Sequence, residues 1–226
     1  MSTGTTKAEQ TKRTILETAM ELFLKEGYEA TTMREIAKRA NMSPGATYYY
    51  FPSKEHIIQH YYEEGHREQL VAAQEALATE KSLEGRLAAV IRAQMRTAQP
   101  YHSMSRILFK TAADPAHPIS PFSAESKKLR DENTQIFADL LHNSATSLAG
   151  VPKKFRDRLP ELLWLYKMGI ILYWVHDSSP DQEKTFRLID ISAGLITTLI
   201  TASKIPGIKT LVNKGVAMFD EFKPYE

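Results

Sequence analysis

The polar groups best suited to chemistry in this chain lie within one short segment, residues 43–54. Small side chains near its start would let a backbone come close to the edges of DNA bases, and the tyrosine hydroxyls that follow can donate to phosphate oxygens. Lys54 adds a cation next to Ser53, which can cap a helix, and the N-terminus of a helix attracts anions. This pattern predicts binding to a phosphate backbone.

Helix signals around the segment indicate the elements that must position it. Thr32 and Glu35 have the spacing of a capping box, which predicts a helix over 33–40. Ser43 can cap a second helix that begins with a proline, where the missing N–H does no harm, and Pro52 ends that helix. Two short helices joined by a tight turn are typical of a helix-turn-helix that lies on DNA.

A helical hairpin with a surface cluster of tyrosines is the alternative interpretation of this region. It is disfavoured because the tyrosines occupy three successive positions, 48–50, which face different ways around a helix. Core aromatics seldom show that arrangement.

The region 12–58 resembles the DNA-binding domain of TetR-family transcriptional regulators. The resemblance rests on three pieces of sequence. They are an amphipathic first helix from Thr14 through Glu26-Gly27-Tyr28, the phrase Thr-Thr-Met-Arg-Glu-Ile-Ala at 31–37, and the signature Ser-Pro-Gly-Ala-Thr-Tyr-Tyr-Tyr-Phe-Pro-Ser-Lys-Glu at 43–55. It covers about a quarter of the chain. It implies an all-helical homodimer whose remaining helices bind a ligand and dimerise, and most such proteins repress transcription until a small molecule releases them.

The resemblance and the local chemistry together assign a set of DNA contacts. Met33 stands where the family often has a hydroxyl residue, and Tyr50 replaces a common histidine, so no operator sequence can be carried over. The expected DNA-binding residues are Thr32, Arg34, Ser43, Gly45, Ala46, Thr47, Tyr48, Tyr49, Tyr50 and Lys54.

The composition agrees with a DNA-binding protein that uses a few placed contacts and not a high overall positive charge. The formal net charge of the 226 residues is only +2, so the chain does not coat nucleic acid as a polycation, and a few placed groups, doubled in a dimer, must suffice. It has no cysteine, which excludes disulfides and cysteine-ligated metals. The N-terminus lacks the apolar core of a signal peptide, and the most apolar run, 162–175, is too short to cross a bilayer. We expect a cytoplasmic protein.

The capping residues, prolines and glycines along the chain predict an all-α fold with two domains. Residues 1–60 would form a three-helix helix-turn-helix domain, with 1–8 disordered, and 61–226 a helical effector-binding and dimerisation domain. A long helix from 53 to about 78 would belong to both domains. Capping residues, prolines and glycines predict the other helices at 83–99, 101–113, 122–148, 152–175 and 180–204, the last of these capped by Ser179, and a final one after 206–207 that ends near 222.

Two of these helices are apolar on more than one face, so they must be buried in a core or against a second copy of the chain. The resemblance implies the second arrangement, a four-helix dimer interface, whereas a monomer with a buried core is the alternative. The expected interface residues are Leu172, Val175, Leu188, Ile191, Leu195, Ile196 and Leu199.

The second domain also contains many aromatic and methionine side chains, which suit an adaptable pocket for an apolar or aromatic effector. Ordinary core packing accounts for such residues equally well. Arg92, Arg96 and Arg106 can meet an anionic ligand or stay solvated. The expected pocket residues are Met95, Tyr101, Met104, Phe109, Phe137, Trp164, Met168 and Tyr173.

Taken together, the patterns predict an effector-responsive repressor that binds a pseudo-palindromic double-stranded DNA operator as a homodimer. Three alternatives remain: a transcriptional activator, a DNA-binding protein without an effector, and a helical sensor or scaffold that does not touch DNA. The sequence holds no nucleophile elbow, phosphate loop or metalloprotease pattern, so we expect no enzyme, no cofactor and no metal.

Overall fold

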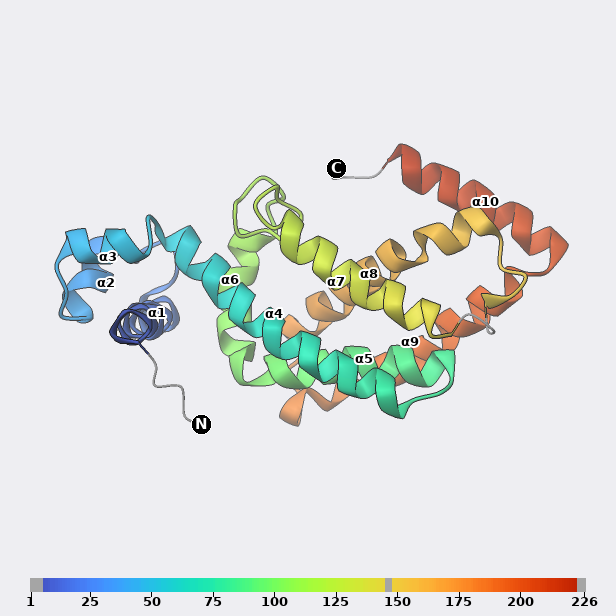
Figure 1. Ribbon diagram of the computed structural model, residues 1–226, viewed down its shortest axis with the longest axis horizontal. Helices are drawn as coiled ribbons and strands as arrows, with labels where there is room; N and C mark the ends of the chain where they lie inside the picture. The colour runs from blue at the N-terminus through green and yellow to red at the C-terminus, as the bar shows by residue number, and fades with distance from the viewer. Residues whose placement is uncertain (1–5, 145–147, 223–226) are drawn as a thin grey trace. The chain divides into compact units, whose positions relative to one another are not determined.

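The computed structural model describes residues 6–144 and 148–222, and over these residues its regular structure is helical with no strand (Figure 1). The all-α prediction is confirmed. The α-helices are α1 (Lys7–Glu26), α2 (Met33–Arg39), α3 (Pro44–Tyr50), α4 (Lys54–Thr79), α5 (Leu83–Ala98), α6 (His102–Ala112), α7 (Lys127–His142), α8 (Lys153–His176), α9 (Glu183–Ala202) and α10 (Pro206–Glu221).

The chain divides into two compact units that are not two consecutive segments. The N-terminal unit contains residues 1–65 and 101–126, and the C-terminal unit contains 66–100 and 127–226. The sequence predicts a single domain boundary after residue 60, with residues 61–226 in one domain. The difference is the segment 101–126, which packs with the N-terminal helices, so the chain passes between the units three times.

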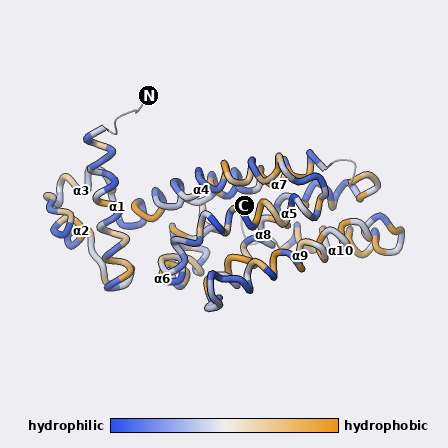
Figure 2. The backbone as a smooth tube through the Cα atoms, turned by 90° about the horizontal axis from the view of Figure 1, so that it is seen from below, coloured by the Kyte–Doolittle hydropathy of each residue, from blue (hydrophilic) through white to orange (hydrophobic). Residues whose placement is uncertain are grey.

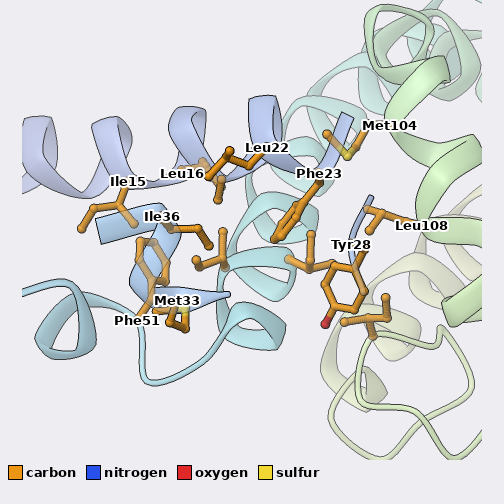
Figure 3. Close-up of a cluster of buried hydrophobic side chains, with 14 residues drawn as sticks. Ile15, Leu16, Leu22, Phe23, Tyr28, Met33, Ile36, Phe51, Met104 and Leu108 are labelled. Atoms are coloured by element: carbon orange, nitrogen blue, oxygen red, sulfur yellow. The ribbon is translucent and has the colours of Figure 1, made fainter. Parts of the chain in front are cut away.

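A hydrophobic core holds the N-terminal unit together (Figure 3). Phe23 of α1 and Ile36 of α2 are fully buried in it, and Tyr28 meets the edge of Phe23 with ring centroids 5.1 Å apart. Met104 and Leu108, one turn apart on α6, lie in the same cluster, as does Ile119 from the loop that follows. These apolar residues explain why 101–126 belongs to this unit.

Helix α1 begins earlier than the resemblance alone indicated. Thr6 caps it through its side chain, which accepts from the backbone N–H of Glu9, while the Glu9 carboxylate accepts from the backbone N–H of Thr6. The prediction that residues 1–8 are disordered is therefore wrong for 6–8, and its remainder, 1–5, lies outside the described residues.

The helix predicted from 122 begins instead at Lys127, because the serine-rich segment before it forms consecutive turns. The Ser123 hydroxyl donates to the carbonyls of Pro118 and Ser120, at 3.0 and 2.9 Å, and its oxygen accepts from the N–H of Ser126. Local bonds of this kind compete with helical ones. The helix ends at His142, short of the expected 148, although part of that stretch, 145–147, lies outside the described residues.

In the C-terminal unit, α7 packs along α8, α5 along α9, and α10 against α8 (Figure 1). Its core contains Phe137 of α7 and both tryptophans of the chain, Trp164 and Trp174 of α8, all nearly or fully inaccessible. The sequence predicted α5 and α8 to within one residue at each end, whereas α7 is shorter than predicted and α9 begins at Glu183 and not at residue 180.

Asp177 organises that connection. Its Oδ2 accepts from the N–H and hydroxyl of Thr185 at 2.9 and 2.6 Å, and its Oδ1 accepts from the N–H and hydroxyl of Ser179. Burial alone would raise the pKa of Asp177, but these four bonds lower it to about 2. The expected Ser179 cap opens only a 3₁₀ turn, since Asp181 and Gln182 adopt positive φ, and α9 starts at Glu183.

Among the described residues, one helical stretch, Pro180–Ala202, is long and apolar enough to cross a membrane by length and composition. It is not the run 162–175 that the sequence analysis had singled out. Only 28% of its most apolar window is buried within the chain, which leaves a wide apolar face open.

Candidate DNA-binding surface

Helices α2 and α3 are fixed by the caps that the sequence predicted. The Thr32 hydroxyl accepts from the N–H of Glu35, and the Glu35 carboxylate accepts from the N–H of Thr32 at 2.7 Å. The Ser43 hydroxyl accepts from the N–H of Ala46 at 3.2 Å. Asn41, in the turn between the two helices, has a left-handed φ of 56°. The helix-turn-helix is therefore built by local interactions.

The N-terminal half of α3 presents a bare backbone. Gly45 is exposed, and a Cβ added there would meet no atom within 4 Å. Its φ is not positive, so neither strain nor crowding within the chain requires a glycine at this position. The open space above the helix is what a close approach to base edges needs.

Tyr48 and Tyr49 carry their hydroxyls into solvent beside this bare surface, with 45% and 83% of their residue surface exposed. Tyr50 is half-buried and packs against the hydrophobic core, with its ring centroid 5.3 Å from that of Tyr49. Two of the three predicted tyrosines are thus free to reach a phosphate, and the third supports them. On α2, Arg34 is exposed, together with Lys38 and Arg39, which the sequence analysis had not selected.

The structure corrects the prediction that the Thr47 side chain faces DNA. Its residue is fully buried, and its hydroxyl donates to the Ser43 carbonyl at 3.2 Å, so its side chain faces the core and not the outside of α3. The helical period explains this, because Thr47 faces away from the exposed residues at 45, 48 and 49.

Lys54 has a different environment from the one expected. Its ammonium donates to the carbonyls of Tyr28, Glu29 and Thr31, at 2.8, 3.4 and 3.3 Å, and lies 4.3 Å from the centre of the Tyr28 ring. These carbonyls belong to the turn after α1. The geometry favours a structural role for Lys54 over a phosphate contact, and nothing local in the sequence signals this long-range pairing.

Burial raises the pKa of Tyr28, and so does its neighbour Glu55, whose carboxylate accepts from the Tyr28 hydroxyl at 2.9 Å. Tyr28, Lys54 and Glu55 thus join the end of α1 to the beginning of α4. This network fixes the start of the long helix relative to the helix-turn-helix.

The predicted pocket residues do not gather in one unit. Tyr101, Met104 and Phe109 belong to the N-terminal unit, where Met104 is part of the hydrophobic core. The other five belong to the C-terminal unit: Met95, Phe137 and Trp164 are buried, Met168 is half-buried and Tyr173 is exposed. Arg92 is paired with Asp190, and Arg92 and Arg96 both lie 6.0 Å from the ring centre of Phe186.

Most of the predicted interface residues are accessible on one face of α8 and α9. Leu172 is 50% exposed, and Ile191, Leu195 and Leu199, spaced one turn apart on α9, are 64, 59 and 57% exposed. Leu188 and Ile196 are half-buried beside them. Val175 is a correction, because only 2% of its surface is exposed and its side chain packs inside the unit.

Fold and surface define a class of protein, an all-helical regulator with an N-terminal helix-turn-helix. Residues 15–61 match the family described as bacterial regulatory proteins, tetR family, and residues 86–218 match the tetracyclin repressor-like C-terminal domain. The second match alone covers more than half of the chain. The chain belongs to the TetR family of helix-turn-helix transcriptional regulators.

Curated relatives match the chain over short segments. The chain is 49% identical over 47 residues to the uncharacterized HTH-type transcriptional regulator YuxN of Bacillus subtilis, which covers 21% of this chain and 16% of that protein. It is 40% identical over 55 residues to the HTH-type transcriptional repressor KstR of Mycobacterium tuberculosis, covering 24% of this chain and 25% of that protein. The matches thus span about a quarter or less of these two relatives.

Solved structures match over most of the chain. A putative TetR-family regulator from Syntrophomonas wolfei aligns with a TM-score of 0.66 at 18% identity, over 84% of this chain and 96% of that one. A tetR-family regulatory protein from Rhodococcus RHA1 aligns with a TM-score of 0.60 at 24% identity, over 84% and 97%. At these identities the likeness establishes the fold of both units.

Proposed function

We propose that this protein is a cytoplasmic transcriptional repressor that binds a pseudo-palindromic operator as a homodimer and leaves it when a small molecule binds the C-terminal unit. The observation that carries the DNA-binding part is the bare, exposed N-terminal half of α3, where Gly45 has open space above it and the hydroxyls of Tyr48 and Tyr49 lie in solvent. Repression is supported by the relative KstR, which is described as a repressor.

The proposed contacts fall into two groups. The backbone at Gly45 and Ala46 approaches base edges, where sequence is read, and Tyr48, Tyr49 and Arg34 bind phosphates, which set the register of the protein on the duplex. Ser43 and Thr32 contribute through the helix N-termini that they cap. Lys38 and Arg39, at the exposed end of α2, are further candidates for phosphate contact.

Homodimerisation is supported by the apolar face of α8 and α9. Ile191, Leu195 and Leu199 form a stripe along α9 that is more than half exposed in the single chain, and Leu172 on α8 is exposed as well. Orange stretches of high hydropathy run along α9 in Figure 2. Large apolar side chains at this density are typical of a surface that another copy covers.

The signal is proposed to pass through the chain segments that link the units. Helix α4 begins in the N-terminal unit at Lys54 and ends in the C-terminal unit at Thr79, and α6 belongs to the N-terminal unit although the helices on either side of it do not. A ligand changes DNA affinity only through its different affinity for the DNA-competent and incompetent shapes. A movement of α4 with respect to α1–α3 would change the separation of the two α3 helices in the dimer.

The test is a gel-shift titration with the DNA that flanks the protein's own coding region, against an excess of unrelated duplex. We expect a retarded complex that survives the competitor and weakens steeply with salt. Retardation that the competitor abolishes would indicate a nucleoid-type binder without sequence preference. A protein that retards no DNA at low salt would contradict the proposal.

A further inference from the structure

Lys167 of α8 is a buried cation with few partners. Only 3% of its residue surface is exposed, and its ammonium donates to the Asn133 Oδ1 of α7 at 2.6 Å. No ion pair joins it to a carboxylate among the described residues. An ammonium has three N–H donors, and a buried charge is costly unless opposite charge or further hydrogen bonds compensate it. Lys167 therefore has unused capacity to bind an anion.

The nearest polar side chains hold Lys167 in place without neutralising it. The Asn133 amide donates to the Leu129 carbonyl at 2.9 Å and also faces Nδ1 of His66 on α4, at 3.1 Å. The other ring nitrogen of His66 lies 3.0 Å from the carboxylate of Glu132. The one acidic group in this polar cluster therefore meets the imidazole, and a neutral amide meets the ammonium.

Electrostatic effects at both basic groups reflect this arrangement. Burial lowers the pKa of Lys167 to about 7. Burial also lowers the pKa of His66, and the neighbouring charge of Lys167 lowers it further, although Glu132 acts in the opposite direction. Lys167 is thus the group in this cluster that lacks a negative partner, and an anion placed beside it would supply one.

The surroundings of Lys167 along α8 are apolar. Leu163 and Trp164 lie one turn before it and Ile170 one turn after, and all three are 2 to 3% exposed. A molecule bound there would need an apolar body as well as an anionic group. A single ammonium and a neutral amide suit one negative charge, whereas doubly charged phosphate groups generally require several cations.

A small pocket borders this cluster at Glu132. It has a volume of about 60 Å³ and lies between α4 and α7, where Leu70 and Ile136 line it. Glu132 also lines it, and the same carboxylate contacts His66. The pocket is too small for an organic molecule in this conformation, so ligand binding would have to part α4 and α7.

A second buried polar group in the same unit lacks partners independently of Lys167. Gln94 of α5 is fully buried, and neither atom of its amide has a hydrogen-bond partner. Buried amides are almost always hydrogen-bonded in native proteins. Gln94 is therefore a second place in the C-terminal unit where a polar group of a ligand could form hydrogen bonds.

We propose that Lys167 binds the carboxylate of an organic acid with an apolar body, which reaches it between α4 and α7 and is the effector. The proposal rests on the proposed function, because it names the chemical class of the molecule that releases the DNA. It refines the expectation of an apolar or aromatic effector by adding one negative charge.

Direct binding without DNA tests this inference. The probes are octanoate and 4-phenylbutanoate with their matched alcohols, octanol and 4-phenylbutanol, at pH 6.5. The readout is the fluorescence of the two tryptophans, one of which, Trp164, lies one turn from Lys167 on the same helix. We expect at least one acid to bind the wild type at least about tenfold more tightly than its alcohol.

The charge is removed by Lys167→Met, which keeps an unbranched apolar side chain one atom shorter than that of lysine. Lys154→Met is the matched control, because Lys154 is an exposed lysine of the same helix. We expect Lys167→Met to bind the acid at least about tenfold more weakly and the alcohol unchanged, while Lys154→Met behaves as the wild type.

Three results would overturn the inference: equal affinity of the wild type for acid and alcohol, equal affinity of both lysine variants for the acid, or no binding of either acid. The first and last need no variant and hold even if Lys167→Met fails to fold. A protein that binds DNA but no acid refutes this inference alone. A protein that binds the acid through Lys167 but no DNA keeps the anion site and refutes the proposed function, and with it the role of the acid as effector.

Discussion

At the scale of single residues, a substitution at Gly45 should change DNA binding without lowering the stability of the fold. Because a Cβ there meets nothing within 4 Å and φ is not positive, Gly45→Ala should leave stability unchanged or raise it by about 0.5 to 1 kcal/mol. The added methyl should hold α3 away from the bases and weaken operator binding by about tenfold or more. Thermal unfolding and gel-shift titration measure the two effects.

Gly65→Ala is the matched control for this change. Gly65 is also helical with open space above it, but it lies on α4, away from α3. It should gain the same stability and keep full DNA affinity. Equal DNA affinity for the two alanine variants would remove Gly45 from the proposed contact surface.

Arg34 and Lys54 should respond in opposite ways to the same substitution. Lys54→Ala deprives three carbonyls of a charged donor and should lower the free energy of unfolding by about 1 to 2 kcal/mol, with little change in the salt dependence of DNA binding. Arg34→Ala, at an exposed position, should leave stability unchanged and reduce the salt slope by about one. A reduced slope for Lys54→Ala would restore it as a phosphate contact.

Lys167 should make stability depend on pH in an unusual direction. Its pKa is lowered to about 7 in the folded chain, so between about pH 7 and 10 the unfolded chain binds more protons and stability rises with pH. Lys167→Met should therefore stabilise the protein most at pH 6, and the gain should shrink as the pH approaches 10. His66, Glu132 and Lys128 lie nearby, and because the charge of Lys167 lowers the pKa of His66, Lys167→Met should also raise the pKa of His66. The gain is therefore compared between about pH 7 and 10, where Lys167 itself titrates. A gain independent of pH would indicate packing instead of charge.

At the scale of elements, the exposed stripe of α9 leads to a prediction about assembly. Leu195→Arg should place an unpaired charge in an apolar seam and weaken dimerisation by about a hundredfold or more. Thr201→Arg, at an exposed position on another side of α9, is the control. Analytical ultracentrifugation should find a dimer for the wild type and the control, and a monomer for Leu195→Arg. A wild type that is monomeric at micromolar concentration would exclude this interface.

Elements that depend on neighbours in sequence could be predicted from the sequence. The capping boxes at Thr6 and Thr32 and the Ser43–Pro44 start involve groups within three residues of each other, although only the last two had been recognised beforehand. The stripe formed by residues 191, 195 and 199 could be predicted as well, because helical spacing alone puts these residues on one face.

Other features could not be predicted, because they depend on packing between distant segments. The apolar residues of α6 show that it is buried somewhere, but not that Met104 packs with the N-terminal helices. The bonds from Lys54 to the turn after α1 join residues 23 to 26 positions apart. The burial of Thr47, by contrast, follows from the helical period, because residue 47 lies on the opposite side of α3 from residues 45, 48 and 49.

At the scale of the whole molecule, the proposed function depends on two copies of the chain binding together. The chain has a net charge of only +2, so a single helix-turn-helix gains little from general electrostatic attraction to DNA. Two copies joined through α8 and α9 would add their phosphate contacts and fix the separation of their α3 helices, which must match successive major grooves about 34 Å apart. The proposed ligand-induced movement of α4 would change this separation, and binding to the operator would weaken.

The most direct test of a sequence-reading dimer is a hydroxyl-radical footprint on the DNA that flanks the protein's own coding region. We predict two protected half-sites related by a dyad, with centres about one helical turn or a multiple of it apart, and the loss of both with Leu195→Arg. Uniform protection along the fragment, a single unpaired footprint, or full protection by the Leu195→Arg variant would contradict the account.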